Sequence, residues 1–231
     1  MFYPFFYDPS IIIIIPAMIL VVYAQIKVTS TYNKYSRIYS GSGLTGAELA
    51  SELLRQNNIY DVKVYQIRGR LTDHYDPVRK VLNLSPGVYA SNSLAALGVA
   101  AHEVGHAIQH AVGYKPLNIR ASLVPAANIG ANWGLPMAIF GFIINSEFMI
   151  MLGLVLFAGA LLFHLVTLPV EFNASKRAIT LLERGGYLSA QELPATRKVL
   201  RAAAFTYVAA TLVALANLLR ILMLLGMRRR D

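Results

Sequence analysis

The sequence predicts a mainly α-helical integral membrane protein with about four transmembrane helices and a small α+β unit outside them. Of the 231 residues, 56% are hydrophobic and only 14% are charged, a balance that is unusual for a soluble domain. Several apolar runs reach the roughly 20 residues that a helix needs to cross a bilayer. Between them lie two polar stretches, residues 29–118 and 169–201, which hold most of the charged residues.

Four apolar segments account for the predicted spans: residues 10–28, 121–144, 148–168 and 201–227. The first could also be a secretory signal peptide, but no basic residue precedes it and no clear cleavage site follows it. The second contains Pro125 and Pro136, so we expect a kinked or broken span that faces protein rather than lipid. The chain therefore divides into an N-terminal segment with the first span (1–28), a polar region (29–118), a transmembrane hairpin (119–168), a polar helical segment (169–201), and the last span with its basic tail (202–231).

The first polar region contains signals for helices and strands. Residues 45–58 have helical spacing, with Thr45 as the N-cap and Glu48 three residues later, which is the pattern of a capping box. Residues 62–69 and 79–85 are β candidates, and "DHYDP" (73–77) between them is typical of a turn. A further helix is expected from about Ser91 to Val112, ending at Gly113.

That last helix contains "HEVGH" at residues 102–106, the strongest chemical signal in the chain. Residues four apart share one face of a helix, so His102 and His106 can hold one metal ion. Glu103 lies about 100° further round the helix and can reach a water on that ion without being a ligand. Zinc brings the pKa of such a water toward neutrality, and the glutamate can then take its proton. A zinc site is favoured over the alternative, an alanine-rich helix that holds histidines by chance.

His110 offers a rival pair, because it lies four residues after His106. That pair has no glutamate directly after its first histidine. One ion cannot bind all three histidines, since His102 and His110 lie about 12 Å apart along the helix axis. We therefore interpret His110 as a residue of the helix surface or as one that supports a ligand from behind.

A catalytic zinc ion needs a third protein ligand and an open fourth position. The chain has no cysteine, so the ligand must be His, Asp or Glu. Glu171 is favoured, because it follows the third apolar segment and the preceding hairpin returns the chain to the side of the His102 helix. His164 lies inside the membrane end of that segment, where we expect a buried, hydrogen-bonded histidine. The remaining candidates are Asp73, His74, Asp76 and Glu147.

Two stretches, "AAHEVGHAIQH" and "LPVEFNASKRA", together resemble the YugP-type neutral zinc metallopeptidases, a family of small membrane proteins. The resemblance extends along nearly the whole chain and includes "LTDHYDP" and "LNLSPGVYASNSLAALGVAAHE". More distantly, the chain is similar to the gluzincin membrane proteases of the HtpX type and to the CAAX prenyl proteases. The resemblance implies that the α+β unit is a zincin-like catalytic unit.

In those more distant proteases, a Glu-(Tyr/Phe)-x-Ala-Asp segment after a transmembrane hairpin supplies the third ligand. The matching residues here imply Glu171 as the ligand, with Phe172 and Ala174 in agreement. The chain departs from the pattern at Ser175, where those proteases carry an Asp that orients a ligand histidine. Asn173 or Ser175 is then the substitute for that Asp.

The gluzincin resemblance also suggests how a substrate is held. In those enzymes an edge strand near the active-site helix binds the substrate by β-addition, so residues 79–85 are either that strand or a plain structural one. Donors that could stabilise an oxyanion are His74, Tyr75 and Tyr89, and the sequence does not choose among them.

The sequence as a whole predicts a zinc-dependent endopeptidase with one Zn²⁺ ion, held by His102, His106 and Glu171, and with Glu103 as the general base. The expected partners are a protein or peptide substrate and the lipid bilayer, and no nucleic acid. The excess of Lys and Arg in the two polar stretches places the active site on the cytoplasmic side of a cell inner or plasma membrane. Two alternatives are a non-catalytic membrane protein with a structural or regulatory zinc site and, less favoured, an intramembrane protease of the site-2 type. The latter needs an Asp in a later span, where this chain offers only Asn217.

Overall fold

The computed structural model describes residues 11–228, which form two compact units. Among the described residues, the first, here called the apolar unit, comprises 11–25, 119–168 and 206–228, and the second, the polar unit, comprises 26–118 and 169–205. The N-terminal segment up to residue 10 and residues 229–231 of the basic tail lie outside the described residues.

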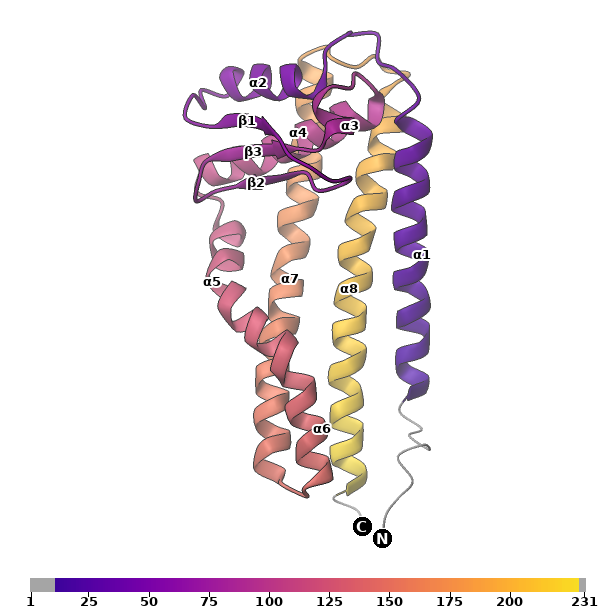
Figure 1. Ribbon diagram of the computed structural model, residues 1–231, viewed down its shortest axis with the longest axis vertical. Coiled ribbons are helices and arrows are strands. Elements are labelled where there is room, and N and C mark those ends of the chain that lie inside the picture. The colour runs from indigo at the N-terminus through magenta and orange to yellow at the C-terminus, as the bar shows by residue number, and fades with distance from the viewer. Residues whose placement is uncertain (1–10, 229–231) are drawn as a thin grey trace. The chain divides into compact units, whose positions relative to one another are not determined.

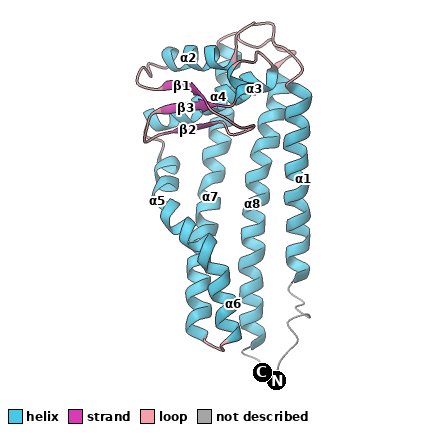
Figure 2. Cartoon of the chain, viewed as in Figure 1, coloured by secondary structure: helices cyan, strands magenta, loops and turns pink. Residues whose placement is uncertain are grey.

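Three long helices dominate the chain: α1 (Ile11–Tyr35), α7 (Glu147–Arg184) and α8 (Leu193–Arg228), as Figures 1 and 2 show. Each is continuous through the boundary between the two units, so each contributes residues to both. By length and apolar composition, all three could cross a membrane. They contain the apolar segments expected to form the first, third and fourth spans.

The second apolar segment does not form such a helix. It consists of α5 (Lys115–Ile129), a π-helical turn η1 (Gly130–Gly134) and α6 (Leu135–Ile143). Pro125 lies inside α5 and Pro136 lies in the first turn of α6, where each removes a backbone N–H from the helical ladder. The expectation of a broken segment is confirmed. Among the described residues, however, the helices that could span a membrane number three rather than about four.

Within the apolar unit, small residues allow close packing of α6 and η1 against α7. A Cβ added to Gly153 of α7 would lie 2.6 Å from the carbonyl oxygen of Gly134, and one added to Gly141 would lie 2.7 Å from the backbone nitrogen of Ile150. Close approach of helix backbones at small residues is typical of packing between membrane helices.

The polar unit begins with α2 (Gly46–Gln56), whose start confirms the expected capping box. The Thr45 side chain accepts a hydrogen bond from the Glu48 backbone, and the Glu48 carboxylate accepts one from the Thr45 N–H. After α3 (Pro86–Tyr89), the helix α4 (Leu94–Ala111) is capped by Ser93. It ends before Gly113, which has a φ of 63° that glycine adopts at little cost.

Three short strands form a sheet in the order β1-β3-β2: β1 (Lys63–Gln66), β2 (His74–Asp76) and β3 (Val81–Leu84). β1 pairs with β3 in parallel and β2 pairs with β3 in antiparallel fashion. The prediction of a turn at 73–77 was therefore wrong for 74–76. The turn comes after β2, where the Asp76 carboxylate accepts hydrogen bonds from the backbone N–H groups of Val78 and Arg79.

The sheet also corrects the interpretation of residues 79–85 as an edge strand. β3 is the central strand and is paired on both sides, so it has no free edge to which a substrate could add. The edge strand that contacts α4 is β2. Leu82 and Leu84 of β3 are fully buried and pack with Leu97 and Val104 of α4 in the core of the polar unit.

Candidate metal centre

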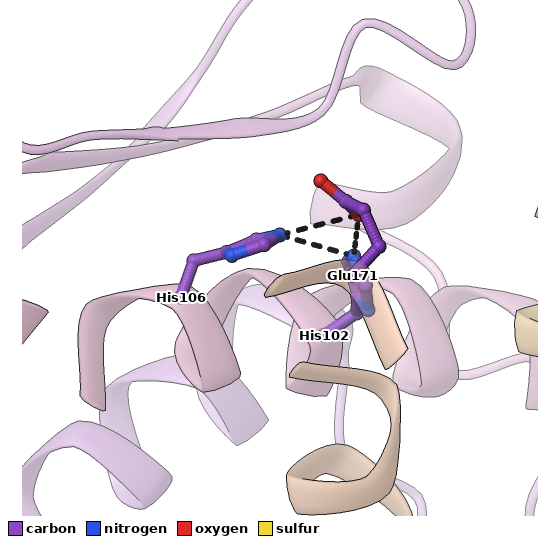
Figure 3. Close-up of side chains that lie close together, drawn as sticks. All are labelled: His102, His106 and Glu171. Atoms are coloured by element: carbon purple, nitrogen blue, oxygen red, sulfur yellow. Dashed lines mark hydrogen bonds and ion pairs between the residues drawn. The ribbon is translucent and has the colours of Figure 1, made fainter. Parts of the chain in front are cut away.

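Three side chains of the polar unit converge on one point, as Figure 3 shows. Nε2 of His102 lies 3.2 Å from Nε2 of His106 and 3.3 Å from Oε2 of Glu171. Nε2 of His106 lies 3.6 Å from the same carboxylate oxygen. The two histidines come from one face of α4 and the glutamate comes from α7, 69 residues after His102.

These separations fit a zinc ion. Zinc binds histidine nitrogen and carboxylate oxygen at about 2.0–2.1 Å, so donors on neighbouring corners of a tetrahedron lie about 3.4 Å apart. The three observed distances lie close to that value. Two nitrogens and one carboxylate oxygen are also a donor set that zinc prefers.

A glycine allows the two ligand-bearing helices to approach. Gly105 lies between the two histidines, and a Cβ added to it would lie 2.8 Å from the carbonyl oxygen of Ala174 on α7. Ala174 is fully buried. Glycine on α4 and alanine on α7 thus bring the backbones close enough for Glu171, one turn before Ala174, to reach the histidines.

His106 is oriented from behind by Gln109, which the sequence analysis did not identify. Nδ1 of His106 lies 3.0 Å from Oε1 of Gln109. The Gln109 amide nitrogen donates to the carbonyl oxygen of Val170 (2.8 Å) and to Oδ1 of Asn173 (3.0 Å), which also accepts from Arg177. Both amide protons of Gln109 have acceptors, so its oxygen is left to accept the Nδ1 proton of His106. The lone pair on Nε2 of His106 then points toward Nε2 of His102 and Oε2 of Glu171.

His102 is supported in the same way by Ser175. Oγ of Ser175 lies 3.2 Å from Nδ1 of His102, so a hydroxyl contacts the ring at the position where the more distant resemblance implied a carboxylate. Of the two substitutes considered from the sequence, Ser175 contacts a histidine, whereas Asn173 contacts Gln109. A neutral hydroxyl raises the basicity of the ring less than a carboxylate does.

The Glu171 carboxylate dominates the electrostatics of the cluster. Burial by itself lowers the pKa of His106, but hydrogen bonding to Glu171, the charge of Glu103 and the charge of Glu171 together raise that pKa above its ordinary value. Glu171 is buried, and the side chain of His106 is only 11% exposed. A buried carboxylate beside two imidazoles favours a positive charge between them, which a proton or a metal ion can supply.

Glu103 lies next to the cluster on α4 and is only 7% exposed. Its Oε2 accepts a hydrogen bond of 3.0 Å from the backbone N–H of Tyr75 in β2. The backbone of the edge strand β2 therefore orients the carboxylate that the sequence analysis predicted to be the general base.

His110 is not part of the cluster. Its Nδ1 lies 2.8 Å from the hydroxyl of Tyr75, so the same tyrosine contacts Glu103 through its backbone and His110 through its side chain. Burial, followed by the charges of Asp61 and Asp76, raises the pKa of Tyr75 to about 12. The Tyr75 hydroxyl therefore stays protonated at neutral pH and remains a hydrogen-bond donor.

The other candidate ligands have different surroundings. Asp73 accepts hydrogen bonds from the backbone and hydroxyl of Ser85, and Nδ1 and Nε2 of His74 contact the Thr72 carbonyl and the Asn83 side chain. Asp76 caps the turn after β2. Glu147 and His164 belong to the apolar unit. Within residues 11–228, no fourth His, Asp or Glu joins His102, His106 and Glu171.

Comparison with known proteins agrees with this geometry. A family model described as "Putative neutral zinc metallopeptidase" matches residues 10–226. The protein "Putative membrane protease YugP" of Bacillus subtilis (strain 168) is 46% identical over 214 residues, which cover 93% of this chain and 95% of that relative. No solved structure gives a significant match. The resemblance read from the motifs is confirmed, and the chain belongs to the family described as "Putative neutral zinc metallopeptidase".

Proposed function

We propose that the chain is a zinc-dependent endopeptidase that hydrolyses peptide bonds of membrane or membrane-near proteins. In this proposal His102, His106 and Glu171 hold one zinc ion and Glu103 is the general base. The observation that carries it is the set of three donor atoms at tetrahedral separations beside a buried carboxylate that is not one of them.

The roles of the residues follow from their surroundings. Zinc, when bound, acts as a Lewis acid that polarises a carbonyl and makes water a nucleophile near neutral pH. Glu103 accepts the proton of the attacking water and passes it to the leaving amine, and the Tyr75 N–H keeps its carboxylate oriented for both transfers. Gln109 and Ser175 hold the two imidazoles with Nε2 toward the ion.

The number of donors supports catalysis over a structural zinc site. Structural sites in proteins close all four positions with protein ligands, whereas catalytic sites leave one position open. His74, the residue whose participation would have favoured a structural site, contacts Thr72 and Asn83 instead. Among the described residues the cluster has three members, which is the number expected for an enzyme.

The proposed substrate class rests on the course of α7. Glu171 lies three residues beyond the apolar segment 148–168 in the same continuous helix, about 4.5 Å along its axis. A site so close to the end of a membrane-spanning segment meets substrates in or near the bilayer. The basic residues of the polar stretches support a cytoplasmic site in the cell inner or plasma membrane.

The test combines zinc quantification with cleavage of a casein-type substrate by the purified full-length protein. We expect about one zinc per chain and measurable cleavage for the wild type. Glu103→Gln should keep its zinc but lose activity by about 10²–10⁴-fold, because an amide cannot accept the proton. Glu183→Gln, an exposed change of the same kind on α7, is the matched control and should retain both properties. Full activity of Glu103→Gln would remove that residue from the mechanism, and zinc binding without cleavage by the wild type would favour the structural or regulatory site.

A further inference from the structure

A basic groove lies in the polar unit between α1 and α8, apart from the metal centre. Its volume is about 610 Å³, and its charged lining residues are Lys27, Lys34, Lys198 and Arg201. They follow helical spacing, since Lys27 and Lys34 are two turns apart on one face of α1 and Lys198 and Arg201 are one turn apart on α8. Phe205 lies one turn after Arg201 on the same face of α8, and Nζ of Lys27 is 5.6 Å from the centre of its ring.

The positive charge of this groove is not balanced by its own walls. The helix segments 26–35 and 193–205 contain no Asp or Glu. In the described part of the chain, Lys34, Lys198 and Arg201 form no ion pair with a carboxylate, and all three are exposed. Like charges one turn apart on a helix destabilise it slightly, so an anion in the groove would relieve repulsion between Lys198 and Arg201.

The groove also has a fixed place along two candidate membrane helices. In α1 the strongly apolar residues 11–22 come before Lys27, and in α8 the apolar residues 206–219 come after Phe205. Along both helices the cations therefore begin where the apolar sequence ends, which is the depth of lipid headgroups if these helices cross the bilayer. The hydroxyl of Thr31 lines the same groove and adds a donor that suits a phosphate, whereas the Ser30 hydroxyl donates to the Lys27 carbonyl.

We propose that this groove binds the phosphate-bearing headgroup of an anionic phospholipid. Lys and Arg near an anionic membrane surface attract such lipids. The groove is far larger than a lone phosphate, and Phe205 and Ala202 give it an apolar wall on the side where the acyl chains would begin. The site is independent of the zinc chemistry, because none of its residues belongs to the metal cluster.

The experiment uses the purified full-length protein in micelles of a neutral detergent. Fluorescent phosphatidylglycerol is titrated in, with phosphatidylcholine as the zwitterionic comparison and inorganic phosphate as the soluble competitor. The test variant carries Lys198→Gln and Arg201→Gln. The control variant carries Lys63→Gln and Arg68→Gln, an exposed pair in the polar unit with the same loss of charge. Zinc content and thermal unfolding of both variants show that each is folded.

We expect the wild type to prefer phosphatidylglycerol, and the test variant to bind it about 25-fold more weakly, at about fivefold per cation. The control variant should change by less than twofold, and Lys198→Arg should bind as the wild type does. Equal losses in the test and control variants would reduce the effect to net charge and overturn the proposal. So would equal binding of the two lipids. Displacement of the lipid by millimolar inorganic phosphate would assign the groove to a soluble anion instead. Displacement by an oligonucleotide whose binding requires Lys198 and Arg201 would assign it to nucleic acid.

Discussion

Oε1 of Gln109 lies 3.0 Å from Nδ1 of His106, on the side of the ring that faces away from Glu171. Gln109 is fully buried, and its amide is fixed by Val170 and Asn173 of α7. One side chain thus links the helix that carries two proposed ligands to the helix that carries the third. Gln109 contributes no donor atom to the cluster itself, so it is a positioning residue.

Replacement of Gln109 should therefore weaken metal binding without removing a ligand. Gln109→Ala is expected to lower zinc affinity by about 10–100-fold, as for other residues that orient metal-binding histidines. Competition with a zinc-sensitive dye measures the change. Gln66→Ala, an exposed glutamine of β1, is the control and should bind zinc as the wild type does. Unchanged affinity of Gln109→Ala would mean that the His106 ring is held by packing alone.

Matched substitutions can distinguish the three proposed zinc ligands from nearby residues that do not bind the metal. His102→Ala, His106→Ala and Glu171→Ala should each lower bound zinc, because each removes one of three donors. His110→Ala and Glu183→Ala, on the same two helices, should not. Metal analysis of the purified variants decides the matter. Loss of zinc in His110→Ala with retention in His102→Ala would identify the rival histidine pair as the metal site.

Close packing at Gly105 leads to a prediction about helix spacing. Gly105→Ala places a methyl group 2.8 Å from the backbone of α7 at Ala174, so α7 must shift and carry Glu171 with it. Overpacking of this kind costs about 1–3 kcal/mol of folding free energy, and zinc affinity should fall as well. Gly98→Ala is the control: it crowds Thr196 of α8, a helix without a proposed ligand. It should lower thermal stability but leave zinc affinity unchanged, and equal zinc loss in both variants would contradict the interpretation.

Zinc binding should depend on pH through His106. Because Glu171 holds the pKa of His106 above its ordinary value in the metal-free protein, the ring remains protonated to higher pH than a free histidine. Zinc needs the neutral ring, so its affinity is fully present above this raised pKa and falls as the pH drops through it. Calorimetric titrations near pH 7 in buffers of different ionisation enthalpy should reveal proton release on zinc binding. Constant affinity between pH 8 and pH 6 would rule this coupling out.

The orientation of the chain can be read by cysteine labelling, since the native sequence has no cysteine. Ser42 is exposed in the polar unit, and Ser42→Cys should resist an impermeant thiol reagent in intact cells and react after lysis. Ser146→Cys, in the turn before α7, should react in intact cells, because the hairpin reverses direction there. Labelling of Ser42→Cys in intact cells would place the active site outside.

Local signals in the sequence were sufficient for much of this architecture. The spacing of His102 and His106 needs only helical geometry, and the Thr45 and Glu48 pair needs only the start of α2. Both depend on residues within one or two turns. Pro125 and Pro136 likewise indicated a broken segment, although they did not show that a π-helical turn would separate two short helices.

The features that were missed depend on partners far along the chain. "DHYDP" looks like a turn because Asp and Pro favour one, yet residues 74–76 extend because β3 pairs with them and Glu103 accepts the Tyr75 N–H. β3 is the central strand because β1 pairs with it on the side opposite β2. Gln109 follows His106 by three residues, a spacing that puts both on one face, but its anchors on α7 lie 61 and 64 residues away. A search for hydrogen-bonding residues three or four positions from each histidine would have found it.

The distance in sequence between His102 and Glu171 has a consequence for biosynthesis. Glu171 follows His102 by 69 positions, and the residues between them include the entire apolar stretch of the hairpin. At about 5–20 residues per second, a ribosome needs roughly 3–14 s to proceed from the first of these side chains to the second. During that interval the nascent chain carries His102 and His106 without Glu171, the third residue of the cluster. Under the proposed function, a nascent chain that has not yet reached Glu171 therefore lacks one of its three zinc ligands and cannot complete the site.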